Sequence, residues 1–534
     1  MKFNYFKASL IVLMCLVTQN LFSYDIQVDG IYYNILSFDD LTCEVTSSPN
    51  GYSGNINIPS KLNYNGRQLL VTQIGKKAFA GCTIKEFHLP SSVKTIGDDA
   101  FHLWHAERVF IEDIKSWLEL DFSSTSNIDY DCLVQEGTSL YFNGELCRKV
   151  TIPNGIPVIR MNAFRNVQTL EEVIIPEGVQ KIESCAFQDC IKLQKAKIPS
   201  SCKTIGGQAF YNDSALNSVM SIPATIDTLY RGAFGGCEFD SVCIEYAESE
   251  IYITSECLDT KVLNLQRRIN DVSKEGVKTY RSQRMSPDIQ KLIIGPHVTY
   301  IPAGTFSKLD LLKELVVEDG SEVLSLGYVL WNEYVSGYSG SYTITLHEGC
   351  FYNTHIQKIY VGRELSWYEY GGFYPNSAYE LEIKDIIIGD AVEELGTKFA
   401  ELLNKCYNLA YISFGKNMWY IPDMSKVTPK AIVSWNTNPP SATSFSDNTY
   451  LNCPVYVPIG SKEAYQKADV WKRFWNIIEK DDKFLTSITT VSDKDKKTGK
   501  QNQYTISGLK TKRLQRGINI IQESDGTTKK IFVK

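Results

Sequence analysis

The 534-residue sequence has few of the residue patterns that support catalysis or cofactor binding. It contains six histidines and none of the motifs H-E-x-x-H, G-x-S-x-G, G-x-x-x-x-G-K-[ST] or G-x-G-x-x-G. His102 and His105 lie close together, but no third metal ligand accompanies them. The spacing of Asp and Glu also gives no reason to pair two carboxylates as acid and base. We therefore expect a protein that is not an enzyme and that binds no metal or other cofactor.

Basic clusters and long apolar runs are also scarce. The net charge is −6 and the body of the chain has no Lys/Arg cluster, which argues against nucleic-acid binding. The apolar run Ala8–Val17 follows two lysines, precedes a tolerable cleavage site before Tyr24, and is shorter than the ~20 residues of a membrane span. Residues 1–23 are therefore predicted to be a Sec-type signal peptide of a secreted or outer-surface protein without an integral membrane span. A membrane anchor and lipidation at Cys15 are the alternatives.

What the sequence does contain is a repeat of roughly 23 residues. Its clearest copy runs from Leu170 to Phe187. Ile-Pro or Leu-Pro recurs, and Ala-Phe follows ten residues after most of these prolines, at 100–101, 163–164, 186–187, 209–210 and 233–234. A fixed period of about 20–29 residues is typical of a solenoid with one strand per turn.

The spacing within a repeat explains how one turn is built. Val173 and Ile175 face the same side of a strand, and the proline that follows ends the strand. Val179, Ile182 and the Ala-Phe pair predict a turn and a short helical or 3-10 segment on the opposite wall. One repeat buries too few apolar side chains to offset the entropy of ordering its backbone, so the repeats must stack.

The same six-residue window recurs along the chain and predicts a series of parallel strands. The predicted strands are Ser53–Ile58, Ile84–Leu89, Ala106–Ile111, Cys147–Ile152, Leu170–Ile175, Leu193–Ile198, Asn217–Ile222, Phe239–Ile244, Ile289–Ile294, Leu312–Val317, Ile356–Val361, Ile383–Ile388 and Leu409–Phe414. Residues between the two inward positions look outward from the sheet; among them are Glu172, Ile174, Lys195, Lys197, Lys358, Tyr360, Asp385, Ile387, Tyr411 and Ser413. This mixed and wide surface suits a macromolecular partner better than a metabolite.

The pattern L-x-x-V-x-I-P-x-x-V-x-x-I-x-x-x-A-F-x-x-C resembles the BspA-like leucine-rich repeats of Bacteroidota surface proteins. The resemblance covers roughly residues 50–480 and is closest at 147–244. Residues 24–33 and 455–479 are similar to the caps of those proteins, whereas 246–288 and 321–380 depart from the pattern. The resemblance implies a right-handed leucine-rich repeat coil whose ligand is a host matrix protein, a host cell-surface protein or another bacterium.

These features divide the chain into segments. The predicted segments are a signal peptide (1–23), an N-terminal β cap with the first repeat strand (24–72), regular repeats (73–245), degenerate repeats (246–415) with a Tyr-rich insertion (321–380), a C-terminal cap (416–480), a linker (481–500) and a small β module (501–534). The module alternates like strands around turn residues and is similar to the sorting modules of type IX secretion. A β appendage without an address role is the alternative.

Aromatic residues gather in the Tyr-rich insertion, between 328 and 379, where glycines interrupt the repeat. Aromatic side chains supply contact area at a low entropy cost, so these rings are candidates for ligand binding. The candidates are Tyr360, Trp367, Tyr368, Tyr370, Phe373 and Tyr374, together with Tyr411 on a strand face. The alternative is that the rings fill the core of widened coils.

Three functions fit these features. The first is a non-catalytic surface protein that binds another protein, in adhesion to a host, a matrix or other cells. The second is a glycan-binding surface protein whose 328–379 rings stack on sugars. The third is a structural scaffold without a soluble partner.

The cysteines give a first test of the repeat. Cys82, Cys190 and Cys237 each follow the repeat Phe by three residues, in a slot that holds Asp213 in one copy. Cysteines two coils apart lie ~10 Å from each other, beyond the ~7 Å limit for a disulfide. We expect most cysteines to be free and packed as small hydrophobic residues. Mass spectrometry after thiol labelling in denaturant should find most of them reactive, and labelling of fewer than half would contradict this prediction.

Overall fold

The computed structural model describes residues 24–122, 132–253, 257–270, 285, 287–337, 340–367, 373, 381–483, 502–505, 510–511, 517–522 and 528–533. The predicted signal peptide and most of the predicted linker lie outside these residues. The chain forms two compact units, the first made of 1–202 and 206–216 and the second of 203–205 and 217–534.

The first unit begins with an antiparallel β segment. It contains β1 (Ile26–Val28), β2 (Ile31–Ser37) and β3 (Thr42–Thr46), and β3 continues in parallel to β6 (Arg67–Ile74), which also pairs with β5 (Lys61–Tyr64). The change from antiparallel to parallel pairing at β3 lets later coils add one strand at a time.

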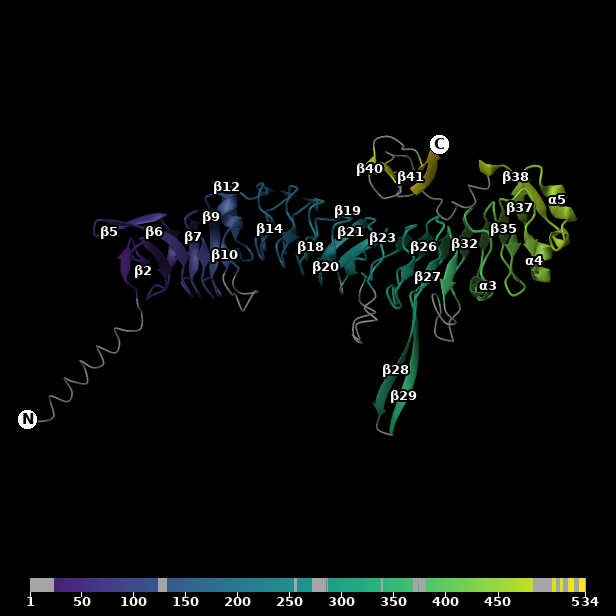
Figure 1. Ribbon diagram of the computed structural model, residues 1–534, viewed down its shortest axis with the longest axis horizontal. Coiled ribbons are helices and arrows are strands. Elements are labelled where there is room, and N and C mark those ends of the chain that lie inside the picture. The colour runs from purple at the N-terminus through teal and green to yellow at the C-terminus, as the bar shows by residue number, and fades with distance from the viewer. Residues whose placement is uncertain are drawn as a thin grey trace, which may run out of the picture. The chain divides into compact units, whose positions relative to one another are not determined.

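The main wall of the first unit carries the predicted strands (Figure 1). One sheet contains β4 (Ser53–Asn57), β7 (Thr83–Leu89), β9 (His105–Ile111), β11 (Ser139–Phe142) and β12 (Glu145–Leu146), and the next contains β13 (Lys149–Thr151), β15 (Glu172–Ile174) and β17 (Lys195–Ala196). Strand β11, which no predicted window covers, pairs in parallel with β9.

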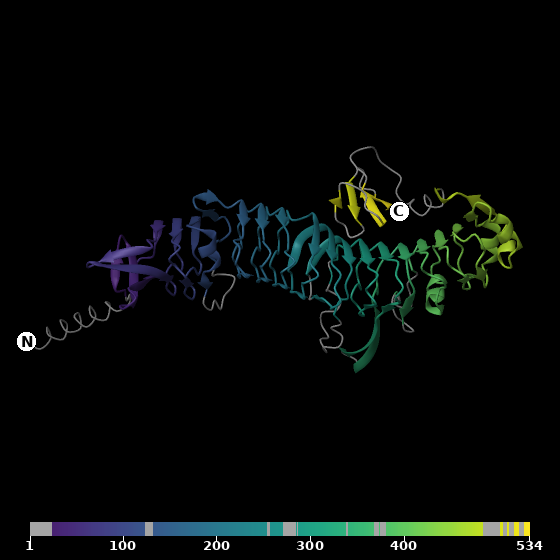
Figure 2. The ribbon, with the colours of Figure 1, turned by 45° about the horizontal axis from the view of Figure 1, so that its top comes forward.

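The second unit has an 11-stranded main sheet, seen side by side in teal and green in Figure 2. Its strands are β19 (Val219–Ile222), β21 (Phe234–Ile244), β23 (Leu258–Leu265), β24 (Lys291–Ile294), β26 (Glu314–Val317), β30 (Lys358–Val361), β32 (Asp385–Ile388), β33 (Tyr411–Phe414), β35 (Ala431–Ser434), β37 (Val455–Pro458) and β38 (Ile477–Lys480). A strand lies in each of the thirteen predicted windows, so the predicted strand series is confirmed.

Very short strands form the opposite wall. They are β8 (Thr95–Ile96), β10 (Asp121–Phe122), β14 (Val158–Ile159), β16 (Lys181–Ile182), β18 (Thr204–Ile205), β20 (Thr228–Leu229), β22 (Tyr252–Ile253), β25 (Tyr300–Ile301), β27 (Leu324–Leu326), β31 (Leu365–Trp367), β34 (Tyr420–Ile421) and β36 (Ser441–Ala442). Helices in the described residues are few and short: α2 (Ile114–Leu118), α3 (Thr397–Leu403), α4 (Asp447–Asn452), α5 (Lys462–Lys467) and the 3-10 turn η3 (Trp471–Arg473).

The Ala-Phe segments form turns, whereas the spacing predicted a turn together with a short helical or 3-10 segment. Cys185 has a φ of 57°, and the equivalent Asn162 and Gln208 have 56° and 57°. A left-handed residue at this point prevents a helix from continuing. The turn is closed by a hydrogen bond from Cys190 N to Phe187 O (3.2 Å), and Phe187 N bonds to Ala209 O in the next coil (2.7 Å).

The phenylalanine rings of successive coils stack inside the first unit. Phe187 lies 5.2 Å from Phe164 and 5.0 Å from Phe210, with interplanar angles of 6° and 11°. All three side chains have no exposed surface. These three rings therefore form a column through three successive coils, to which each of them adds one ring.

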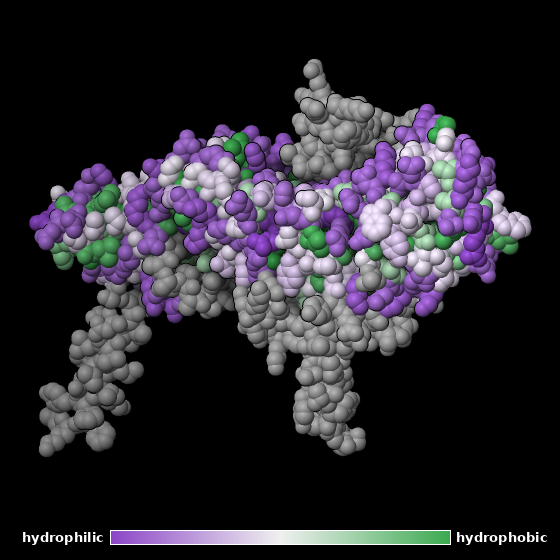
Figure 3. Space-filling view, turned by 45° about the vertical axis from the view of Figure 1, so that its right-hand side comes forward, coloured by the Kyte–Doolittle hydropathy of each residue, from purple (hydrophilic) through white to green (hydrophobic). Residues whose placement is uncertain are grey.

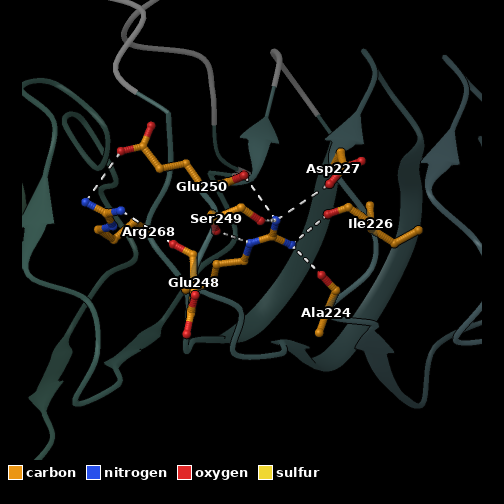
Figure 4. A network of polar contacts seen from close by, with 8 residues as sticks. Ala224, Ile226, Asp227, Glu248, Ser249, Glu250 and Arg268 are labelled. Atoms are coloured by element: carbon orange, nitrogen blue, oxygen red, sulfur yellow. Dashed lines mark hydrogen bonds and ion pairs between the residues drawn. The ribbon is translucent and has the colours of Figure 1, made fainter.

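The degenerate segment 246–288 lacks the proline and Ala-Phe positions of the repeat and contains a buried arginine. The Arg267 guanidinium donates hydrogen bonds to the carbonyls of Ala224, Ile226, Ser249 and Glu250 (2.6–3.1 Å), and Asp227 lies 3.9 Å away (Figure 4). Burial lowers the pKa of Arg267. An Arg side chain has five N–H donors and therefore satisfies several carbonyls at once where the coil is irregular.

A hairpin forms the next departure, within 321–380. Strands β28 (Tyr328–Gly337) and β29 (Gly340–Gly349) pair only with each other among the described strands. Parallel pairing of β26 with β30 continues across the insertion. Arg363, just after β30, donates to the carbonyls of Gly295, Pro296 and Val298 (2.5–2.7 Å) and holds the coils together there.

The chain ends in a small sheet of the type predicted for residues 501–534. Strands β39 (Asn502–Thr505), β40 (Lys510–Thr511), β41 (Gly517–Gln522) and β42 (Thr528–Val533) form an antiparallel sheet in the order β40-β39-β41-β42.

The prediction of free, packed cysteines is confirmed for the described part of the chain. All thirteen cysteines there are buried thiols. Many donate to backbone carbonyls of neighbouring coils; the Cys190 thiol, for example, lies 3.0 Å from Phe164 O. A small side chain with a weak donor fits a slot between two turns.

Removing one ring of the column should destabilise the protein locally. We expect Phe187→Ala to lower the free energy of unfolding by about 3–5 kcal/mol, because a cavity remains between Phe164 and Phe210. Hydrogen exchange should quicken mainly in the adjoining coils. An equal loss of protection across the whole chain would contradict a stack with nearest-neighbour coupling.

Asp213 should make stability depend on pH. The side chain is fully buried; one oxygen accepts from Cys190 N (2.8 Å) and the other has no hydrogen-bond partner in the described residues. Burial, followed by repulsion from Asp189, raises the pKa of Asp213 well above its usual value. Between the unfolded and the folded pKa of Asp213, the folded state holds a proton that the unfolded state has lost. The free energy of unfolding is therefore greatest at acidic pH and falls as pH rises through the folded pKa.

The variant Asp213→Cys restores the residue that Cys190 and Cys237 supply in this slot. We expect its free energy of unfolding to exceed that of the unchanged protein by about 1–3 kcal/mol at pH 7. The difference should vanish near pH 4. Denaturant unfolding at several pH values measures this. A constant difference between the two proteins at all pH values would show that the Asp213 carboxyl does not titrate abnormally.

Candidate interaction surface

The outer face of the 11-stranded sheet presents two rows of side chains. Because alternate residues of a strand point to opposite sides, each strand contributes two outward positions. The first row holds Lys291, Glu314, Lys358, Asp385 and Tyr411, and the second holds Ile293, Val316, Tyr360, Ile387, Ser413, Val433 and Tyr456. The first row is largely charged and the second largely apolar.

An apolar cluster covers the outer face between β32 and β37. It centres on Tyr411 and Val433, and the partly buried residues packed against them are Ile387, Ala431, Trp435 and Tyr456. We call these six residues the outer cluster. Tyr411 is only 8% exposed although it points away from the coil interior. A packed cluster on this face means that its rings are held in fixed positions before any partner arrives.

Trp435 is held in place from the neighbouring strand. Its indole N–H donates to Ser413 Oγ at 3.0 Å, and the Lys416 ammonium lies 5.8 Å from its ring centroid. Gly415 follows β33 where a Cβ would meet the Gly389 carbonyl oxygen at 2.3 Å. Only glycine permits this close approach of the two backbones.

Tyr360 occupies the neighbouring part of the second row. Its hydroxyl donates to Asp319 Oδ1 at 2.5 Å, and burial together with this bond raises the pKa of Tyr360. A Cβ on Gly389 would lie 2.7 Å from the same hydroxyl, so Tyr360 lies close over a glycine backbone. Both contacts involve the hydroxyl, so they hold that end of the side chain in place.

Charges in the first row are compensated. Lys291 and Glu314 form an ion pair of 3.0 Å, and Lys358 faces Asp385 across the next pair of strands. Burial raises the pKa of Asp385, and Lys358 and Lys384 oppose that shift. Such half-exposed pairs add about 0–1 kcal/mol of stability, so their main effect is to fix which charges face solvent.

The family model for the BspA type leucine-rich repeat region matches six copies, at residues 55–141, 135–261 and 338–455. The chain belongs to the BspA-type leucine-rich repeat family. Among solved structures, it is similar to a leucine-rich repeat protein from Bacteroides ovatus (17% identity, 86% of this chain and 100% of that chain, TM-score 0.35). No curated protein matches the chain.

Two further solved structures are similar to this BspA-type chain. One is a leucine-rich cell surface protein from Faecalibacterium prausnitzii (16% identity, 83% of this chain and 97% of that chain, TM-score 0.29). The other is the pneumococcal vaccine antigen PcpA (15% identity, 85% of this chain and 98% of that chain, TM-score 0.27).

The described residues of this BspA-type chain contain no helix long and apolar enough to span a membrane. They also contain no group of three or more His, Cys, Asp or Glu side chains that could hold a metal ion.

The structure separates the sequence-predicted ligand residues into three sets. Tyr360 and Tyr411 lie on the outer sheet face. Trp367 is half-buried at 5.9 Å from Phe373, which is itself 5% exposed and stacks on Phe351 at 5.1 Å. Tyr368, Tyr370 and Tyr374 lie outside the described residues. Phe373 is thus buried among rings of its own coils, whereas Trp367 keeps part of its surface exposed.

Four members of the outer cluster were not among the residues named from the sequence. Ala431, Val433, Trp435 and Tyr456 lie in the segment predicted to be the C-terminal cap, through which the main sheet runs as β35, β37 and β38. The signal that was present is strand-like alternation in Ala431–Ser434 and Val455–Val457. What it lacked was the proline and Ala-Phe spacing of the repeat.

The Tyr411 hydroxyl gives a test of packing in the outer cluster. It is buried and makes no well-formed hydrogen bond in the described residues; burial raises its pKa, and the nearby Ser413 hydroxyl opposes that shift. We expect Tyr411→Phe to raise the free energy of unfolding by up to about 1 kcal/mol, because an unpaired buried polar atom is removed. Tyr465→Phe is the matched control: that hydroxyl donates to Ser434 Oγ at 2.6 Å, so its loss should destabilise by about 1–2 kcal/mol. Equal destabilisation by both changes would contradict the assignment.

Proposed function

We propose that the chain is an exported, non-catalytic surface protein that binds other proteins through the outer face of its main sheet. Adhesion to a host, to a matrix or to other cells is the role we assign to this binding. Membership of the BspA-type leucine-rich repeat family supports a binding role at the cell surface.

The observation that carries the proposal is the outer cluster. Tyr and Trp are enriched where protein interfaces concentrate their binding energy, and side chains already fixed lose little entropy on binding. In this cluster, the Trp435 indole donates a hydrogen bond to Ser413, and Tyr411 and Tyr456 pack with Val433. The rigid sheet beneath keeps the rings at constant spacing.

The rest of the surface is mixed in character. On the face drawn in Figure 3, hydrophilic residues predominate and hydrophobic residues form small separate groups. Interfaces between independently folded proteins differ little in overall hydrophobicity from the surface around them. A candidate interface is therefore recognised by ordered aromatic side chains more than by a wide apolar area.

Binding of the full-length protein to a panel of immobilised matrix and host cell-surface proteins tests the proposal. We expect Trp435→Ala and Tyr456→Ala each to weaken binding by ten-fold or more while the folded state persists by circular dichroism. Trp475→Ala is the matched control, since Trp475 is 79% exposed and lies outside the outer cluster.

Three results would contradict the proposal. Binding that survives both cluster substitutions places the interface elsewhere. Binding to free oligosaccharides on a glycan array, with no protein bound, makes the chain a glycan receptor. The absence of any partner at micromolar concentration favours a structural scaffold.

A further inference from the structure

A second ordered surface lies on the first unit, separate in the chain from the outer cluster. His88, Phe110 and Tyr141 occupy paired outward positions on β7, β9 and β11. Their rings stack with centroids 4.3 and 4.6 Å apart and interplanar angles of 4° and 19°. These spacings are close to the ~4.8 Å between neighbouring strands, so the sheet itself sets the stack. We call these three residues the ring ladder.

Stacking determines which part of each ring a partner can reach. The two faces of Phe110 are covered by His88 and Tyr141. All three side chains are half-buried, so the ladder presents ring edges to solvent. The edge of an aromatic ring carries positive partial charge, whereas its face is negative. The ladder is therefore a strip of weakly positive C–H groups, with a Tyr hydroxyl and an imidazole beside them.

A polar row runs parallel to the ladder, one outward position earlier on each strand. Asn55 Nδ2 donates to Glu86 Oε2 at 3.0 Å, and Arg108 Nη2 lies 2.8 Å from Glu86 Oε1. Both oxygens of Glu86 thus already accept a hydrogen bond. Arg108 has five N–H donors and no acceptor, and its side chain is 40% exposed. The hydrogen-bonding groups of this row that remain available to a partner are therefore mainly donors.

The charged residues that flank the polar row do not change its donor character. Lys85 and Glu107 are exposed neighbours of Glu86 and Arg108 and carry opposite charges. The Glu86 charge is compensated by Arg108, and His88 Nε2 lies 4.0 Å from the same carboxylate. Between the opposite charges of Lys85 and Glu107, a partner therefore meets the Arg108 guanidinium, the Asn55 amide and the ring edges, which favour oxygen acceptors.

We propose that the ring ladder and Arg108 form a docking site for a protein segment that carries Asp or Glu side chains. The partner's carboxylate binds the Arg108 guanidinium, and its backbone carbonyls lie along the ring edges. Because the rings and Glu86 are held before binding, little side-chain entropy is lost. The site is distinct from the outer cluster and does not depend on it.

The geometry disfavours a sugar in the same place. Sugar rings pack against open aromatic faces, and here the faces of Phe110 are covered by the neighbouring rings of the ladder. A glycan is therefore the competing outcome of the test and not part of the proposal.

Fluorescence anisotropy of the full-length protein with three labelled twelve-residue peptides tests the site. The peptides alternate Ala with Glu, with Ser or with Lys. We expect saturable binding of the Glu peptide alone, weakened several-fold on raising salt from 50 to 200 mM. Arg108→Gln and Phe110→Ala should each weaken it at least ten-fold. Glu86→Gln should strengthen it, because it removes the competing carboxylate, an effect that a purely structural role would not produce.

The chain offers a matched control. Arg148 and Glu171 form a similar ion pair between neighbouring coils at 2.7 Å, and neither residue belongs to the ring ladder. Arg148→Gln should leave binding of the Glu peptide unchanged. Equal binding of the three peptides, equal loss in Arg148→Gln and Arg108→Gln, or binding of maltohexaose that Phe110→Ala abolishes would each overturn the proposal. Trp435→Ala, which tests the outer cluster, should have no effect here, so failure of one site is distinguishable from failure of the other.

Discussion

Contact between successive coils is the constraint on which the structure depends. A coil of this length cannot bury its own apolar side chains, so each must be covered by the coils before and after it. Two sets of bonds connect them: the ladders of the main sheets, and hydrogen bonds between the Ala-Phe turns, such as Phe187 N to Ala209 O at 2.7 Å. The column of phenylalanine rings fills the space between these walls. Insertions and irregular coils occur only where this contact between coils is kept.

The departures from the repeat follow the same constraint. Where proline and Ala-Phe disappear, carbonyl groups of adjacent coils would lack partners, and an unsatisfied buried carbonyl is costly. Arg267 and Arg363 meet this need with guanidinium groups that are almost wholly buried. The hairpin β28–β29 is accommodated differently, because it leaves the stack and returns between β26 and β30, which still pair in register. Insertions are tolerated when the strands on either side can still meet.

The solvent side of the main sheets is free of this packing constraint, and its side chains differ in character from one stretch of strands to another. One stretch carries the outer cluster, another carries the ring ladder, and the strands between them carry charged pairs such as Lys291 and Glu314. A rigid sheet beneath them sets the distance between neighbouring side chains at the strand spacing. A leucine-rich repeat can thus present several chemically different surfaces without change to its core.

The amino-acid sequence by itself determined the repeat, the strands and the inward side chains, because these depend on spacing within about 23 residues. Val173 and Ile175 lie two residues apart, so their common direction needs no knowledge of the rest of the chain. The sequence could also place Tyr360 and Tyr411 on the outer face. Only the tertiary structure decided which outward residues meet, since Trp435 with Ser413, and His88 with Phe110 and Tyr141, come from different coils. Those contacts depend on the register between strands some twenty to thirty residues apart, and irregular coils alter that spacing in ways that no local pattern records.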